Sequence, residues 1–152
     1  MLIQRLLAGC VLSVVCVVLV STASADTPAK PSLKVSSPKP KEVVSVPPGE
    51  FTIIEAVGTH NLDPNDAVYA FLKCRFGHMY LQRPEVDLSG NTFRHDNIYV
   101  GENIRLLRFV RVPQASKNKI KAWMQEKPRA LSADEIRGLG GETVGEVELD
   151  VK

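Results

Sequence analysis

The chain has 152 residues and a formal net charge of only +2 at pH 7. This near-neutral balance argues against nucleic acid as a main partner, because binding along a phosphate backbone needs a clear excess of basic side chains. At this length we expect one domain, large enough to bury a core without disulfides.

The first 25 residues have the pattern of a secretory signal peptide. A positively charged start at 1–5 precedes an apolar run at 6–20 and the small-residue sequence Ala-Ser-Ala at 23–25. That order is typical of a cleaved signal. We therefore expect an exported protein, periplasmic or extracellular. Cleavage after Ala25 leaves 127 residues with a net charge of +1, since Arg5 is the only charged residue removed.

Two alternatives to cleavage stay open. The apolar run of 15 residues is shorter than the ~20 that cross a bilayer, which weighs against a retained membrane anchor. Leu-Ala-Gly-Cys at 7–10 is similar to a lipoprotein box, but most of the apolar run follows Cys10 instead of preceding it. We expect no stable membrane span after signal cleavage.

Cysteine usage fits an exported protein that is not built on disulfides. Cleavage removes Cys10 and Cys16 and leaves Cys74 alone, so the mature chain has no internal pair. Cys74 is either buried, as free cysteines usually are, or paired with another chain.

Residues 26–42 are rich in proline and lysine and predict an extended N-terminal segment. Its lysines are either solvated or touch an anionic surface, and Leu-Lys-Val at 33–35 is a possible first edge strand. The remainder, 43–152, is expected to form the domain.

From Val43 onward the pattern is mainly β. Apolar and β-branched runs alternate with Gly, Pro and Asn/Asp turns at short intervals, as in all-β proteins with two packed sheets. Ala-Val-Tyr-Ala-Phe-Leu at 67–72 predicts a central strand covered on both faces, with Leu72, Cys74 and Phe76 inward. Strands are expected at 43–46, 51–57 (ending at Gly58), 67–76, 79–83, 93–100, 105–112 and 143–151.

One helix is expected before the last strand. Ser116 is a candidate cap, Pro128 stops the helix, and Ile120, Trp123 and Met124 share one face. Trp123 either packs on the sheets or anchors a partner. Ser-Ala-Asp-Glu at 132–135 fits a capping box over a short helical turn.

Between about 33 and 151 the chain resembles a bacterial secreted domain of the immunoglobulin-like β-sandwich fold. The resemblance rests on the order of blocks LKVSSPKP, FTIIEAVGT, DAVYAFLK, MYLQRPEV, GNTFRHDNIYVG and RLLRFVRVP, followed by a final strand. It implies a mainly antiparallel fold, here with an inserted helix, and a non-catalytic module without cofactors. The cysteine pair and central-strand tryptophan of antibody domains are absent.

Several residues are candidates for chemistry. His60, Asp63 and Asp66 share a loop and are weak metal ligand candidates, but an Asx-turn is the simpler interpretation. Cys74 and His78 suggest a thiol–imidazole pair, although spacing alone does not bring them together.

Arg105, Arg108 and Arg111 form a candidate interaction surface together with Trp123. At three-residue spacing, the arginines of a strand alternate between its faces, so at least one lies inward, at a bulge, or beyond the core.

The hypothesis favoured by the sequence is an exported binding module whose partner is a protein or an envelope polymer. The alternative is a small exported enzyme or metal-dependent ligand binder that uses the His60–Asp66 loop or the Cys74 region.

Overall fold

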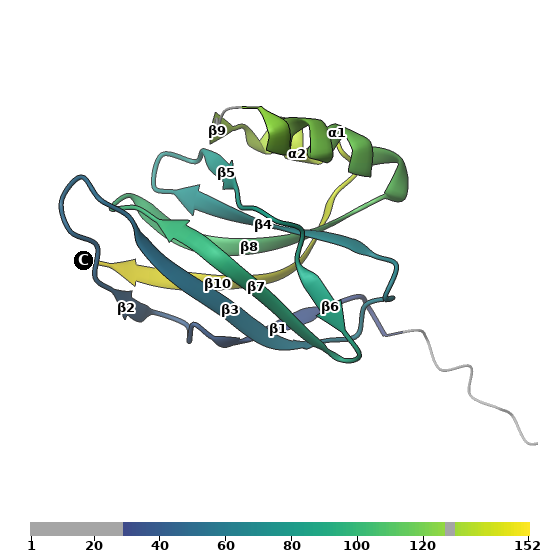
Figure 1. Cartoon of the computed structure of the whole chain (residues 1–152), viewed down its shortest axis with the longest axis horizontal. Coiled ribbons are helices and arrows are strands. Elements are labelled where there is room, and N and C mark those ends of the chain that lie inside the picture. Colours follow the sequence, from purple (N-terminus) through teal and green to yellow (C-terminus); the bar gives the residue numbers. More distant parts are fainter. Residues whose placement is uncertain (1–28, 127–129) are drawn as a thin grey trace, which may run out of the picture.

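The fold consists of two β-sheets and two helices, in a computed structural model that describes residues 29–126 and 130–152 (Figure 1). The signal peptide expected at 1–25 and the helix stop at Pro128 lie outside the described residues. The elements, in chain order, are β1 (Leu33–Ser37), β2 (Glu42–Val44), β3 (Thr52–His60), β4 (Ala67–Cys74), β5 (Met79–Leu81), β6 (Asp87–Ser89), β7 (Thr92–Val100), β8 (Ile104–Val112), α1 (Gln114–Gln125), β9 (Ala130–Leu131), α2 (Ala133–Arg137) and β10 (Glu142–Val151).

The two sheets are almost entirely antiparallel, which confirms the mainly antiparallel β fold. One sheet has four strands in the order β1-β3-β7-β6, and the other has six in the order β2-β10-β8-β4-β5-β9. The parallel pair is β2 with β10. The possible edge strand at 33–35 is present as β1, which pairs with β3.

The larger core lies between the two sheets. Phe93 on β7 and Phe109 on β8 meet edge to face there, with ring centroids 5.2 Å apart. On β4, Val68 and Leu72 face this core, whereas Tyr69 and Phe71 face a second core on the other side. The prediction of a central strand covered on both faces is therefore confirmed.

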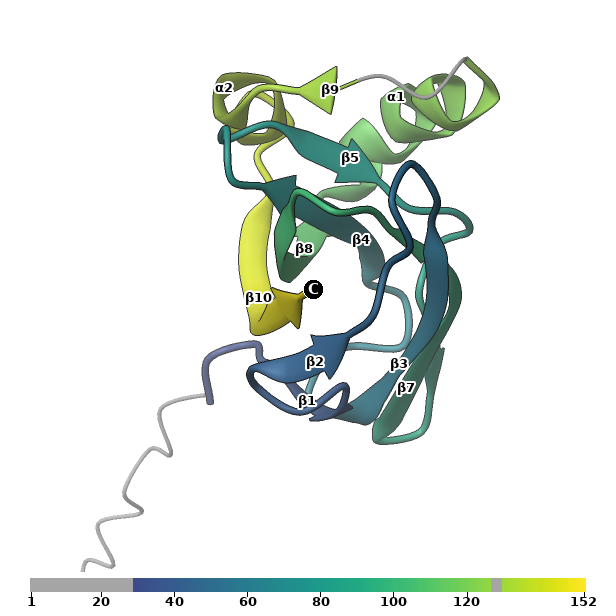
Figure 2. The same cartoon turned by 90° about the vertical axis from the view of Figure 1, so that its left-hand side faces the viewer.

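The second core separates the six-stranded sheet from the helices, which lie on the side away from the four-stranded sheet (Figure 2). Ile120 of α1 is fully buried against it, and Trp123 and Met124 are packed beside it. The predicted apolar face of α1 is confirmed. The Ser132–Glu135 capping box of α2 is also present, with both reciprocal hydrogen bonds formed.

The predicted cap of α1 is wrong. The helix begins two residues before Ser116, and Pro113 occupies the N-cap position without a side-chain hydrogen bond. The Ser116 hydroxyl instead donates to the backbone carbonyl of Leu139 at 2.7 Å. A serine inside the first turn can satisfy a distant carbonyl in this way, which sequence spacing does not reveal.

Two expected strand details are also wrong. β3 continues through Gly58 to His60, because the missing side chain lets two strands approach closely: a Cβ there would lie 2.0 Å from the Lys34 carbonyl oxygen. β4 ends at Cys74, so Phe76 lies in the following turn and is exposed instead of facing inward.

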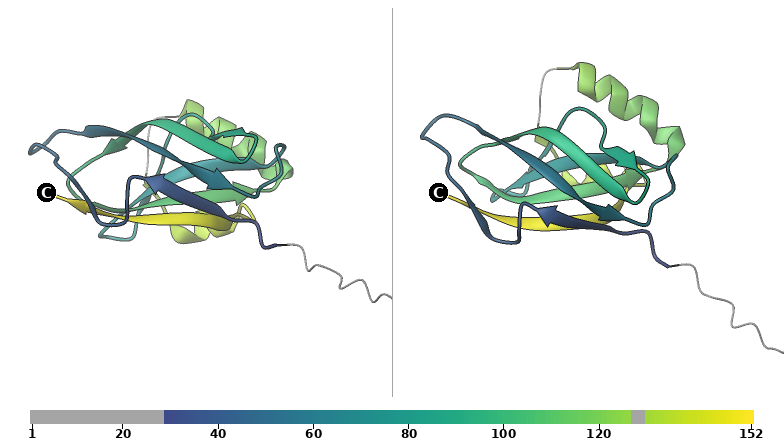
Figure 3. Two further views of the ribbon diagram at one scale, coloured as in Figure 1. Left: turned by 90° about the horizontal axis from the view of Figure 1, so that it is seen from below. Right: turned by 60° about the horizontal axis from the view of Figure 1, so that its bottom comes forward.

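β1 lies beside β10 in both views of Figure 3, at the side where the two sheets approach each other. A Cβ at Gly145 on β10 would lie 2.6 Å from the carbonyl oxygen of Leu33 on β1. Neither helix in the described ranges is long and apolar enough to cross a membrane.

Candidate functional site

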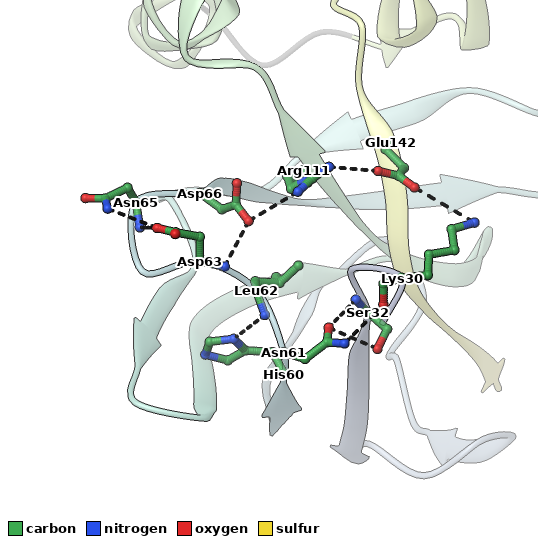
Figure 4. Close-up of polar contacts among 10 residues, drawn as sticks. All are labelled: Lys30, Ser32, His60, Asn61, Leu62, Asp63, Asn65, Asp66, Arg111 and Glu142. Carbon is green, nitrogen blue, oxygen red and sulfur yellow. Dashed lines mark hydrogen bonds and ion pairs between the residues drawn. The ribbon is translucent and has the colours of Figure 1, made fainter. Parts of the chain in front are cut away.

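The His60–Asp66 loop joins β3 to β4, and its polar atoms are bound to one another and to the fold (Figure 4). His60 Nε2 lies 3.0 Å from the Thr92 carbonyl oxygen, and Nδ1 accepts the Leu62 N–H at 3.1 Å. These two contacts fit the tautomer whose proton lies on Nε2. Both ring nitrogens of His60 are therefore used by the backbone.

The acidic residues of this loop form a turn. Asp63 Oδ1 accepts the Asn65 N–H at 2.8 Å, and Asp66 Oδ2 accepts the Asp63 N–H at 3.1 Å. This is the Asx-turn that the sequence suggested as the simpler interpretation. Within residues 29–126 and 130–152, no three His, Cys, Asp or Glu side chains are grouped so as to hold a metal ion.

Arg111 joins this loop to the last strand. Its guanidinium lies 3.4 Å from Asp66 Oδ2 and 3.0 Å from Glu142 Oε2, and Lys30 approaches the other oxygen of Glu142 at 3.8 Å (Figure 4). Arg111 pairs with Val68, a residue of the inter-sheet core, and therefore lies on the inner face of its sheet. The ion pairs of Arg111 with Asp66 and Glu142 therefore close one end of the inter-sheet core.

The three arginines of β8 do not form a single surface. Arg108 pairs with Phe71, which faces the helices, so Arg108 lies on the opposite face from Arg111 and forms an ion pair with Glu146. Arg105 is exposed near the start of the strand, where it donates to the carbonyls of Glu102 and Ile104. Alternation accounts for the separation of Arg108 from Arg111, whereas Arg105 lies at a register shift between β8 and β4, where the alternation is interrupted.

Cys74 and His78 are not arranged as a catalytic pair. Cys74 is buried, as predicted, at 5% exposure in the inter-sheet core, whereas the His78 side chain is exposed in the turn after β4. The two residues are joined only through the backbone, where the Cys74 N–H donates to the His78 carbonyl.

Trp123 is half-buried on α1, and the Lys119 ammonium lies 5.4 Å from its ring centroid. Tyr69, fully buried beneath the helices, donates its hydroxyl to Glu85, which also pairs with Lys117 of α1 at 2.9 Å. Burial, and then the charge of Glu85, raises the pKa of Tyr69, which keeps the phenol protonated. These contacts attach α1 to the sheet.

His95 is the most unusual polar group in the described chain. It lies at 2% exposure on β7, and neither ring nitrogen has a hydrogen-bond partner there. A bulge at Asp96 and Asn97 shifts the strand's alternation, so that His95 and Ile98 are both buried. Burial lowers the His95 pKa to about 4, so the imidazole is neutral at pH 7.

Exposed apolar side chains gather on the outer face of the four-stranded sheet. Ile53 on β3 is directly opposite Tyr99 on β7. The Phe51 ring lies over Gly101, where a Cβ would be 3.2 Å from it. Phe51, Ile53 and Tyr99 are 67%, 56% and 51% exposed, and we call these three residues the apolar cluster.

Sequence reasoning missed the apolar cluster, although a signal was present. The run Phe-Thr-Ile-Ile at 51–54 has apolar residues on both faces of a strand, more than one buried face requires. Acidic residues border the cluster: Glu50 and Glu102 adjoin Phe51 and Gly101, and Glu55 follows Ile53 on the outer face. Glu55 pairs with Arg94, which also binds Asp96.

No protein-family model, curated protein or solved structure matches the chain.

Proposed function

We propose that the protein is an exported, immunoglobulin-like module that acts by binding a protein partner rather than by catalysis. The observation that carries the proposal is the apolar cluster on the four-stranded sheet. The signal-like pattern of residues 1–25 supports export.

The strand order supports an immunoglobulin-like arrangement. If β2 and β5 are treated as additions, the strands β1, β3, β4, β6, β7, β8 and β10 can be lettered A to G. The four-stranded sheet then reads A-B-E-D, and the centre of the other sheet reads G-F-C. Immunoglobulin constant-type domains divide their seven strands between the two sheets in the same way. α1, β9 and α2 are an insertion before the last strand.

Three neighbouring exposed apolar side chains favour a docking surface. A single exposed hydrophobic residue is ordinary on any protein, whereas a group rimmed by polar residues is typical of an interaction site. Tyrosine and phenylalanine are also frequent at interface centres, because their rings bury a large area while losing little side-chain entropy. The cluster combines both features on a rigid two-strand ladder.

The acidic border indicates the kind of partner. Glu50, Glu55 and Glu102 are near neighbours of the apolar cluster along the chain; Glu55 is paired with Arg94, and Glu102 accepts the Gly49 N–H at 2.6 Å. A protein surface that presents an apolar side chain flanked by lysine or arginine complements this pattern in both polarity and charge.

Site-directed photo-crosslinking in the native cells tests the proposal. A photoreactive phenylalanine analogue replaces Tyr99 in one variant and Thr59 in a matched control on the same sheet face. We expect one recurring protein adduct from position 99, weakened by Phe51→Ser and absent from position 59. Equal labelling from both positions, or none from position 99, contradicts the proposal.

Export is tested separately by the intact mass of the protein recovered from outside the cytoplasm. Loss of residues 1–25 supports cleavage, whereas an intact chain supports a retained anchor. A mass gain on a chain that begins at Cys10 supports lipidation.

A further inference from the structure

A second surface lies on the opposite sheet. Lys73, Leu106 and Glu148 form one row across β4, β8 and β10, on the face away from the inter-sheet core. The helices cover the rows around Tyr69 and Val110 but not this one. An open hollow of about 570 Å³ occupies the uncovered part.

Basic side chains predominate around this hollow. Lys41, Lys73, Arg75 and Arg105 border it, together with Glu148 and Asp150. Asp150 is already paired with Lys152 at 3.1 Å. Among the described residues, none of the four basic side chains forms an ion pair with a carboxylate. Four cations therefore face the two carboxylates of Glu148 and Asp150, which leaves the lining of the hollow with an excess of positive charge.

Backbone contacts hold these cations at one end of the sheet. The Arg75 N–H donates to the Asn103 carbonyl at 2.9 Å, which places Arg75 beside the start of β8, near Arg105. The Lys41 N–H donates to the Glu148 carbonyl at 2.8 Å, which brings a third cation from the turn before β2. The hollow is thus built from four separate segments on a rigid sheet.

From this arrangement we infer that the hollow binds a polyvalent oxyanion, a ligand with several closely spaced phosphate or carboxylate groups. Guanidinium groups donate paired hydrogen bonds to either anion, and ammonium groups add charge without fixed direction. A volume of about 570 Å³ accommodates a ligand of several such groups. An anion seated there would also relieve the repulsion among the four cations.

This inference is independent of the protein-docking proposal. The hollow is bordered by residues on and beside β4, β8 and β10 of the six-stranded sheet, whereas the apolar cluster lies on the outer face of the four-stranded sheet. The two surfaces share no residue, so substitutions in one set leave the side chains of the other unchanged.

Calorimetric titration of the purified exported protein with tripolyphosphate and with citrate tests the inference. We expect binding of at least one anion, weakened at least about tenfold by K73Q/R105Q, because two charge-assisted contacts are lost. The matched control is K34Q/K121Q, which removes the same charge from exposed sites outside the hollow and should change affinity by less than about threefold. K41Q/R75Q repeats the test if the first pair impairs folding.

The two anions distinguish the possible ligand sources. If only tripolyphosphate binds, the ligand of the hollow carries phosphate groups. If only citrate binds, the ligand carries carboxylate groups. Amide chemical-shift changes should centre on Lys73, Arg75 and Leu106. The inference is overturned if neither anion binds, or if the control pair weakens binding as much as the hollow pair, since affinity would then follow net charge only.

Discussion

Replacement of His95 by leucine should remove an acid-dependent loss of stability. In the native state the imidazole is buried without a hydrogen-bond partner, and burial lowers its pKa from 6.5 to about 4. In the unfolded chain the pKa returns to its ordinary value. As the pH falls from about 6.5 to about 4, the unfolded state therefore takes up a proton that the native state does not.

The size of the effect follows from the two pKa values. A shift of one pKa unit corresponds to about 1.4 kcal/mol. The lowered pKa of His95 therefore reduces the free energy of unfolding by about 3 kcal/mol at pH 4 and by almost nothing at pH 7.5. The adjacent Asp96 carboxylate acts in the opposite direction and is already included in the lowered value. At pH 7.5 the variant should be at least as stable as the wild type, because no unpaired ring nitrogen stays buried.

Urea unfolding at intervals between pH 4 and pH 7.5 measures the difference. We expect the free energies of unfolding of wild type and H95L to diverge by about 3 kcal/mol as the pH falls. H78Q is the matched control, because His78 is exposed, and it should follow the wild-type curve. Parallel curves for wild type and H95L would refute the argument that His95 is buried and neutral.

Three further predictions concern the core, the ion pairs and the thiol. Ile120→Ala should lower the free energy of unfolding by about 2–4 kcal/mol in urea titrations, since this side chain is fully buried beneath α1. Arg111→Gln should cost about 1 kcal/mol by removing the ion pairs with Asp66 and Glu142, whereas Lys30→Gln, at 81% exposure, should cost almost nothing. Cys74 should react with a thiol reagent such as dithionitrobenzoate only after the protein unfolds, and rapid native labelling would contradict its burial.

The sequence predicted correctly those elements that depend on residues close together along the chain. The apolar run of β4 predicted a strand covered on both faces, and Ile120 and Met124 marked the buried face of α1. Ser132 and Glu135 marked the start of α2 because their reciprocal hydrogen bonds span only three residues. Each of these signals depends on short spacing and elementary side-chain chemistry.

The sequence did not predict the features that depend on contacts between strands far apart along the chain. The sequence pattern predicts that a strand ends at Gly58. β3 instead continues through this residue, because the missing side chain lets β1 approach its backbone. The bulge at Asn97 causes His95 to face inward, and the local sequence pattern does not predict this bulge. The cationic hollow likewise joins Lys41 to Arg105, 64 residues apart, through strand register.

The close approach of β1 to β10 has a mechanical consequence. Leu33 lies beside Gly145, and Val151 is six residues further along β10, so the described chain enters and leaves at opposite ends (Figure 1). Tension between these ends runs along the strands, whereas the hydrogen bonds of the antiparallel β1–β3 pair lie across them. A pulling force between the two ends therefore shears those bonds together instead of opening them one after another.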